Sequence, residues 1–233
     1  MRCIMIIVLI LVLLTTPYWQ STNALDQGIL LKDTSHHHSI KLRSDQILGR
    51  MVLLPLDHYD VKEAMHIISR IDQLPPSLLK KVDRSGIKIQ LFTGKLTDHP
   101  TVSDLKGQTP RGYHNKQTTW DQVPGIGGSK LVLVKIGSSE RGKGHGSINL
   151  ELHELAHSID RYIYNDPYWD LKFLTIWKKE VHKIFPHDSY FHKYPEEYFA
   201  EVFAMYYVDE TARNELKSLA PETFHYILTL QST

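Results

Sequence analysis

Apolar and polar residues follow helical and then strand spacing between residues 57 and 91. A first helix is predicted where apolar residues recur at steps of three and four, at Val61, Ala64, Met65, Ile68 and Ile71. A second helix is predicted to begin at Pro75-Pro76, because proline suits a first turn, and to end at Gly86. Alternation of apolar and polar residues over 87–91 then predicts a strand.

The middle of the chain changes from loop to strand and then to helix. Residues 94–129 carry GQTPRGY and WDQVPGIGG and predict loops. The run KLVLVKIG at 130–137 predicts a strand, either buried or at an edge over a cleft. A polar, glycine-rich connection follows at 138–147, and the rest of the chain has helical spacing. Helices, a small sheet and then helices predict an α+β fold.

The first 24 residues have the layout of a secretory signal peptide. Arg2 precedes an apolar run from Ile4 to Leu14, which is shorter than the about 20 residues that span a bilayer. Small and polar residues follow, and we expect cleavage after Ala24. The alternative is an uncleaved membrane anchor.

Residues 25–56 mix polar residues with short apolar pieces, and we expect a spacer or a weakly ordered arm. This segment contains SHHHS at 35–39. Three adjacent His residues on a flexible segment have no fixed geometry, so we expect no physiological metal site there.

Charge balance and cysteine content narrow the classes of partner. The chain has 27 Lys and Arg against 26 Asp and Glu, and loss of the predicted signal removes Arg2 and leaves no net charge. This balance argues against a nucleic acid or an anionic membrane surface as the main partner. Cys3 is the sole cysteine and lies in the predicted signal. The mature chain must therefore be held by its core, with a metal as a further stabiliser, rather than by disulfides.

The stretch ELHELAHSID at 151–160 contains the pattern H-E-x-x-H, which binds zinc when it lies on a helix. A helix is predicted from an N-cap at Ser147 to a stop at Asn165-Asp166-Pro167, with its buried face at Ile148, Leu152, Leu155, Ile159 and Ile163. His153 and His157 fall together on a different face, one turn apart, where both can bind one ion. The alternative is a solvated helix face with a His/Glu pair.

A catalytic zinc takes three protein ligands, so a third must come from elsewhere. The longer pattern HExxHxxGxxH does not fit, because Asp160 stands in place of Gly and Ile163 in place of the last His. The best candidate is EEYFAE at 196–201, on a helix that Pro195 can begin. One Glu of this segment would reach the metal, and another would accept a hydrogen bond from a ligating His. The alternative is an exposed acidic first turn, which the helix dipole favours.

Several motifs, agreeing in order and spacing, resemble a known family. The segment HELAHSID…YFHKYPEEYFAEVFAMYY…LKSLAPETF resembles the catalytic domain of anthrax lethal factor. The longer set GQTPRGY…TWDQVPGIGG…KGHGSINLELHELAHSID is still more similar to the secreted bacterial Pro-Pro endopeptidases of the same fold. The resemblance covers residues 57–233 and implies a zincin-like metallopeptidase domain over that range.

The resemblance also implies a role for individual residues of the site. His153, His157 and Glu197 would be the zinc ligands, and Glu154 would be the general base. Tyr190, seven residues before the ligand Glu, would stabilise the oxyanion. Another set matches residues that support the site or contact substrate in the family: Glu201 behind a ligating His, and Tyr113, Trp120, Arg111 and Glu196 at the substrate. Tyr113 stands where these enzymes carry Trp, which bears on proline selectivity.

Together these features predict a secreted endopeptidase that binds one Zn²⁺ and acts as a monomer on extended, proline-rich extracellular proteins, between two Pro residues. The strand within 130–136 is expected to add the substrate by main-chain hydrogen bonds, with aromatic walls for rigid Pro-rich peptides. Two alternatives remain. A non-catalytic, metal-stabilised module that binds surface proteins would not need Glu154, because a structural zinc site has no base. A host-directed toxin protease would need a separate partner for cell entry.

Overall fold

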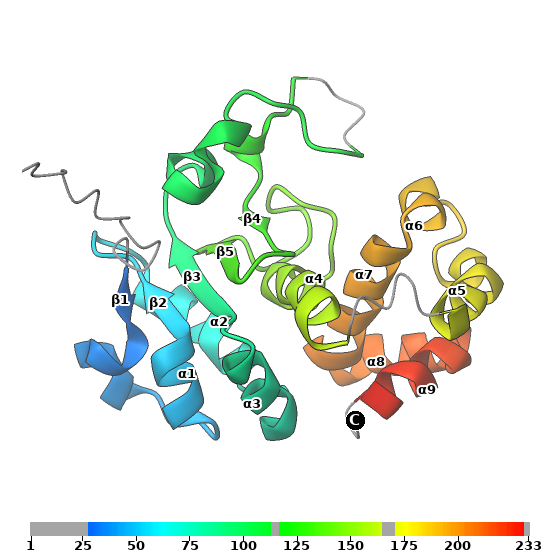
Figure 1. Ribbon diagram of the computed structural model, residues 1–233, viewed down its shortest axis with the longest axis horizontal. Coiled ribbons are helices and arrows are strands. Elements are labelled where there is room, and N and C mark those ends of the chain that lie inside the picture. Colours follow the sequence, from blue (N-terminus) through cyan, green and yellow to red (C-terminus); the bar gives the residue numbers. More distant parts are fainter. Residues whose placement is uncertain (1–27, 113–116, 165–170, 231–233) are drawn as a thin grey trace, which may run out of the picture.

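The computed structural model describes residues 28–112, 117–164 and 171–230. The predicted signal peptide and Tyr113 lie outside this part of the chain. In Figure 1 the sheet and the first three α-helices lie on one side of α4 (Leu150–Ile163), and the C-terminal helices lie on the other. The fold is therefore α+β, as the order of predicted elements indicates.

The sheet lies in the N-terminal half and mixes parallel and antiparallel pairs. Its strands among the described residues are β1 (Ile29–Leu30), β2 (Val52–Leu54), β3 (Lys88–Phe92), β4 (Gly125–Ile126) and β5 (Leu131–Lys135). Their order is β1-β2-β3-β5-β4, with β2, β3 and β5 parallel and both outer strands antiparallel to their neighbours. Strand β4 therefore forms the edge of the sheet nearest α4.

The predicted strand at 130–137 is a central strand rather than an edge strand. Strand β5 pairs with β3 along its full length, from Lys88 opposite Leu131 to Phe92 opposite Lys135, and with β4 on its other side. Both of its edges are occupied by neighbouring strands, so the expectation that residues 130–136 add the substrate is wrong. The edge over the cleft belongs to β4, which the sequence pattern places in a loop.

Residues 28–56 are part of the folded unit, in contrast to the spacer that the sequence predicts. They form β1, β2, two 3₁₀ turns, η2 (Leu31–Asp33) and η3 (Ser35–Ser39), and helix α1 (Asp45–Met51). Leu31, Leu48 and Met51 are fully buried in the main core. The short apolar pieces of this segment are stable because they pair with and pack against strands that are distant in sequence.

The two predicted N-terminal helices are present. Helix α2 (Val61–Ile71) is capped at its N-terminus by Asp60, whose side chain accepts a hydrogen bond from the backbone N–H of Glu63. Helix α3 (Pro76–Arg84) begins with Pro76 and is followed by Gly86, which has a φ of 72°. This left-handed backbone favours glycine and ends the helix as predicted.

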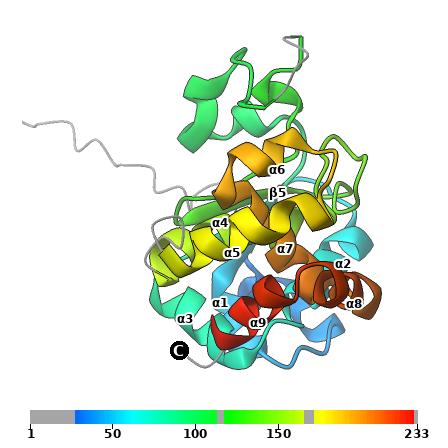
Figure 2. The same cartoon turned by 90° about the vertical axis from the view of Figure 1, so that its right-hand side faces the viewer.

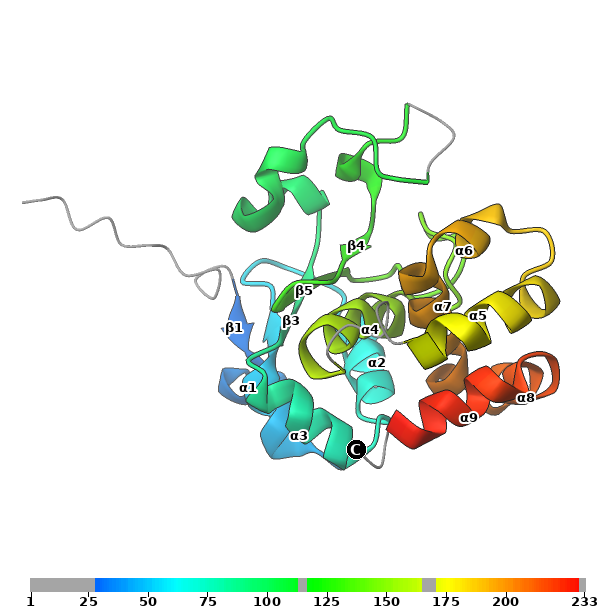
Figure 3. The ribbon, with the colours of Figure 1, turned by 45° about the vertical axis from the view of Figure 1, so that its right-hand side comes forward.

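The C-terminal half is helical, as predicted. The remaining described helices are α5 (Leu171–Ile184), α6 (Ser189–Lys193), α7 (Pro195–Val208), α8 (Glu210–Leu219) and α9 (Pro221–Leu230). Figure 2 looks onto this half, with α6 above α5 and α9 below it, and Figure 3 shows α7 between α4 and these helices. Tyr198, Phe199 and Phe203 of α7 are almost fully buried at the centre of this packing. No helix of the described chain is long and apolar enough to cross a membrane.

The N-cap of helix α4 lies two residues after the predicted one. The side chain of Asn149 accepts a hydrogen bond from the backbone N–H of Leu152 and caps the helix. The hydroxyl of Ser147 instead bonds Nδ1 of His145 at 2.7 Å. The helix ends at Ile163, directly before the predicted stop at 165–167, which lies outside the described residues. Its start is thus set next to the connection at 138–147, which lines the site.

Candidate functional site

A cleft of about 1080 Å³ runs across helix α4. Its walls come from the edge strand β4 and the loop after it, from the connection at 142–147, and from α6 and the start of α7. The side chains of His153, Glu154 and His157 line it from α4. The amphipathic pattern of α4 explains this arrangement, because Leu152, Leu155 and Ile159 turn another face of the helix into the core.

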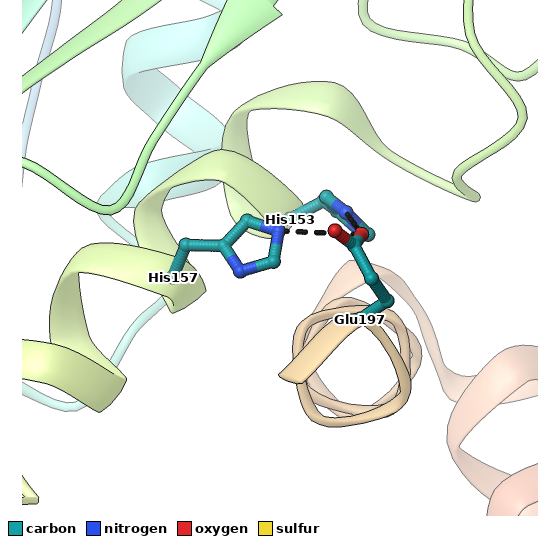
Figure 4. A group of neighbouring side chains, drawn as sticks. All are labelled: His153, His157 and Glu197. Atoms are coloured by element: carbon teal, nitrogen blue, oxygen red, sulfur yellow. Dashed lines mark ion pairs between the residues drawn. The ribbon is translucent and has the colours of Figure 1, made fainter. Parts of the chain in front are cut away.

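Three side chains from two helices meet in this cleft. His153 and His157 lie one turn apart on α4, and Glu197 reaches toward them from the first turn of α7 (Figure 4). Each offers one ligand atom, and these atoms all lie within 4.8 Å of one another. Glu197 Oε2 is 3.4 Å from His153 Nε2 and 3.5 Å from His157 Nε2. Glu197 is therefore the member of the 196–201 segment that joins the pair of His residues, while Asp160 is not part of the group.

The spacing and chemistry of this group fit a zinc ion. Ligands bound at about 2.1 Å to a tetrahedral ion lie about 3.4 Å from one another, which matches both distances from Glu197 to the two imidazoles. Two neutral imidazoles and one carboxylate are also a ligand set that leaves a fourth position for water or substrate. The residues present therefore fit a catalytic rather than a closed structural metal site.

Hydrogen bonds within the group favour the charged forms of His153 and Glu197. Burial alone lowers the pKa of His153, but hydrogen bonds with the carboxylates of Glu197 and Glu201 outweigh it and raise the pKa. Burial likewise raises the pKa of Glu197, but its hydrogen bonds with His153 and His157 outweigh burial and lower it. Glu197 is consequently an ionised carboxylate facing two imidazoles, which attracts a divalent cation.

Glu201 lies one turn beyond Glu197 on α7 and is fully buried. Its Oε2 is 3.2 Å from Nδ1 of His153. The Nδ1–H of a metal-binding His donates to such an acceptor, which fixes the ring orientation and leaves Nε2 for the metal. The position of Glu201 is therefore the one that the sequence predicts for the acceptor behind a ligating His.

Glu154, which lies between the two His residues in the sequence, lines the cleft. Burial raises the pKa of its carboxyl, and the charges of His153 and His157 and a hydrogen bond from the backbone N–H of Gly127 act against that rise. Gly127 follows the edge strand β4 and passes very close to α4: a Cβ added to it would lie 1.9 Å from the carbonyl oxygen of Glu154. A carboxylate in this position can exchange a proton with a water molecule in the cleft.

Tyr190 enters the cleft from the short helix α6. Asp188 caps this helix by accepting a hydrogen bond from the backbone N–H of Tyr190 at 3.0 Å. Burial and the adjacent Glu197 raise the pKa of the Tyr190 hydroxyl, which therefore keeps its proton at neutral pH. Its ring packs against Gly112, where an added Cβ would lie 2.2 Å from the ring. A protonated phenol here can donate a hydrogen bond to a developing oxyanion.

Comparison with known proteins agrees with this arrangement. The family described as anthrax toxin lethal factor, N- and C-terminal domain, matches residues 38–230. A Pro-Pro endopeptidase of Paenibacillus alvei is 38% identical over 188 residues, which are 81% of this chain and 86% of that protein. A Pro-Pro endopeptidase of Clostridioides difficile strain 630 is 38% identical over 198 residues, 84% of this chain and 89% of that protein.

The chain belongs to the Pro-Pro endopeptidase family. The solved structure of the Pro-Pro endopeptidase from Paenibacillus alvei superposes with a TM-score of 0.75 at 38% identity and covers 79% of this chain and 99% of that one. The family match begins at residue 38, inside the segment for which the sequence predicts a spacer. Residues 38–56 of that segment therefore lie within the family match.

The structure also brings together most residues that the resemblance assigns to substrate. Arg111 Nη2 lies 2.7 Å from Glu196 Oε1 and 3.1 Å from Glu197 Oε1, and its guanidinium stacks over the ring of Tyr194. Trp120 is half-buried: it lines the cleft and also packs against a small core cluster. Tyr113 lies outside the described residues.

Sequence motifs do not indicate some of the residues that shape the site. Gly127 contacts Glu154, and Gly112 contacts Tyr190, because each lacks a side chain. Their presence in GIGG and PRGY was a signal for loops, not for close approach to a catalytic group. Arg141 forms an ion pair with Glu201 at 3.0 Å across 60 residues of sequence, which no local pattern indicates.

Proposed function

We propose that the chain is a secreted zinc metalloendopeptidase that cleaves extended, proline-rich protein segments between two Pro residues. The observation that carries the proposal is the group of His153, His157 and Glu197, with Glu154 beside it in a cleft open to substrate. The identity of 38% to two Pro-Pro endopeptidases supports the bond selectivity. The N-terminal signal pattern supports secretion.

Zinc at this site would supply a Lewis acid that polarises the scissile carbonyl and lowers the pKa of its bound water to about 7. Glu154 accepts the proton of the attacking water and passes it to the leaving amine. Burial raises the pKa of Glu154, and a carboxyl with a raised pKa takes up a proton more readily, as a general base must. Tyr190 keeps its hydroxyl proton and donates it in a hydrogen bond to the oxyanion; one such donor contributes about 3 kcal/mol.

The substrate is proposed to lie extended along β4. This strand pairs with β5 on one side only among the described residues, so its other edge is available to main-chain hydrogen bonds from a peptide. Trp120 offers an aromatic surface beside this edge. A proline-rich peptide suits such a wall, since it loses little conformational entropy on binding.

The test is a library of synthetic peptides with varied residues on both sides of the scissile bond, incubated with the zinc-loaded protein and read by mass. Cleavage confined to Pro-Pro bonds is expected, and broad cleavage would remove the Pro-Pro selectivity. No cleavage of any peptide by a zinc-bound protein would favour the metal-stabilised binding module.

Two variants separate chemistry from metal binding. Glu154→Ala is expected to keep the fold and bind zinc but lose turnover, and an active variant would refute its role as the base. Glu197→Ala is expected to lose zinc as well, and an unchanged zinc content, measured by atomic absorption, would remove Glu197 from the ligands.

A further inference from the structure

The carboxylate of Glu201 is enclosed by donors from three directions. Its Oε2 faces Nδ1 of His153 at 3.2 Å, and its Oε1 accepts hydrogen bonds from the backbone N–H of Ile148 at 2.9 Å and from Nη2 of Arg141 at 3.0 Å. In the part of the chain that the structure describes, no Lys and no other Arg forms an ion pair with Glu201. Arg141 is therefore the partner of Glu201 whose positive charge does not depend on pH.

A fully buried carboxylate needs a cation nearby. Taking an ionised carboxylate out of water is unfavourable by several kcal/mol unless charge and hydrogen bonds compensate. The Ile148 N–H supplies a dipole, and Arg141 supplies a full charge with a directional donor. The side chain of Arg141 is 60% exposed, whereas that of Glu201 is 0% exposed. The guanidinium thus reaches one buried oxygen from a side chain that is otherwise mostly exposed, which avoids much of the cost of burying the cation.

The backbone around Arg141 is built to hold it in this place. The ring of His145 bridges the hydroxyl of Ser147 and the carbonyl oxygen of Ser138, both at 2.7 Å. Backbone hydrogen bonds join Ser139 to Leu150 and close the turn after Arg141, and the loop takes left-handed backbone at Gly137, Gly142 and Gly144. Since the same loop lines the cleft and leads into α4, the position of Arg141 is tied to that of the helix that carries both His residues.

We infer that Arg141 is a positioning residue for the metal site. By holding the carboxylate of Glu201 in place, it fixes the ring of His153 so that Nδ1–H points to Glu201 and Nε2 points toward Glu197 and the metal. The inference rests on the proposed zinc site and adds to it a residue that touches neither metal nor substrate. An arginine on the outer side of the cleft would thereby set how tightly the ion is held.

The experiment measures the zinc affinity of the metal-free, full-length mature protein by competition with a chromophoric chelator. Arg141→Met keeps the aliphatic stem and removes the charge, and we expect a loss of about tenfold in zinc affinity, the lower end for residues that support a ligating His. Arg141→Lys restores a cation and is expected to recover most of that loss. Arg50→Met is the matched control, because Arg50 also forms an ion pair, with Asp83 at 2.6 Å, but lies outside the cleft. Its zinc affinity should equal that of the wild type.

A double-mutant cycle with Glu201→Gln tests the route of the effect. If Arg141 acts through the carboxylate, Arg141→Met should have little further effect on zinc affinity once that charge is gone. Unchanged zinc affinity in Arg141→Met overturns the inference, as does a loss that Lys fails to restore or that persists undiminished in the Glu201→Gln background. A wild-type protein that binds no zinc refutes the proposed function itself. Tight binding by both wild type and Arg141→Met refutes the role of Arg141 and leaves the proposed function standing.

Discussion

Replacing Gly127 with Ala should lower the rate of catalysis although every catalytic and ligand side chain of the site is kept. A Cβ at this position would lie 1.9 Å from the carbonyl oxygen of Glu154, 2.7 Å from its carbonyl carbon and 2.9 Å from its Cα. Real Cβ contacts stay above 3.0 Å, and all three neighbours are backbone of α4. The loop after β4 must therefore move away from the helix by about 1 Å, and the hydrogen bond from Gly127 N–H to the Glu154 carboxylate is lost.

A misplacement of about 1 Å between substrate and catalytic groups can lower the rate about 100-fold, which corresponds to about 2.7 kcal/mol of activation free energy. We expect a loss of this size in kcat/KM for a Pro-Pro peptide, with zinc content unchanged because the three atoms nearest the added Cβ all belong to Glu154 and none to a ligand. Gly128→Ala is the comparison: its φ of 76° makes Ala strained, yet the added Cβ would find its nearest neighbour, in His157, at 3.8 Å. That variant should lose about 1–2 kcal/mol of folding stability and retain more activity than Gly127→Ala. Equal activity of Gly127→Ala and wild type would refute the argument.

Three further predictions concern stability. Glu180 is 1% exposed and accepts hydrogen bonds from the backbone N–H groups of Glu222 and Thr223 at the start of α9. Glu180→Ala leaves these donors unpaired and should lower the free energy of unfolding, measured in urea, by about 3 kcal/mol. Replacing its exposed neighbour Lys179 should change that free energy little. Burial lowers the pKa of His99 in the folded protein below its value in the unfolded chain. The stability that neutral His99 contributes is therefore complete above the unfolded pKa and is lost as the pH falls through the folded pKa. Unfolding in urea should show a free energy of unfolding that declines below about pH 6.5, and less steeply in His99→Gln. Removing zinc with a chelator should lower the melting temperature by about 5–10 °C relative to protein in zinc at 100 times its Kd, and an unchanged value would argue against the metal site.

Local patterns were sufficient for the helices that carry the site. The apolar spacing of α4 and the proline at the start of α7 are properties of short segments, and both helices lie where the pattern predicts them, apart from the N-cap of α4, which is Asn149 rather than Ser147. The two His residues one turn apart follow directly from helical geometry. The choice of Glu197 as the third member required either the family resemblance or the structure, because spacing alone placed Glu197 and Glu201 on one helix face and did not decide between them.

Long-range pairing explains what the sequence did not predict. Strands β1 and β2 have two and three residues and become strands through neighbours that are distant in the chain, and β4 has two residues and pairs with the strand that follows it, β5. Residues 28–56 consequently resemble a spacer in sequence and are core in the structure. The ion pair of Arg141 with Glu201 has the same origin, since a packing of α7 against α4 brings the two residues together.

The division of the metal group between α4 and α7 also determines when the protein can become active. Both imidazoles are synthesised about 40 residues before the carboxylate that completes the group, and α7, which carries that carboxylate, packs most extensively against α4 and also against α8 and α9. A nascent chain that ends before α7 has both imidazoles on α4 and lacks the carboxylate of Glu197. The group of three side chains is therefore assembled only after α7 has been made and has packed against α4.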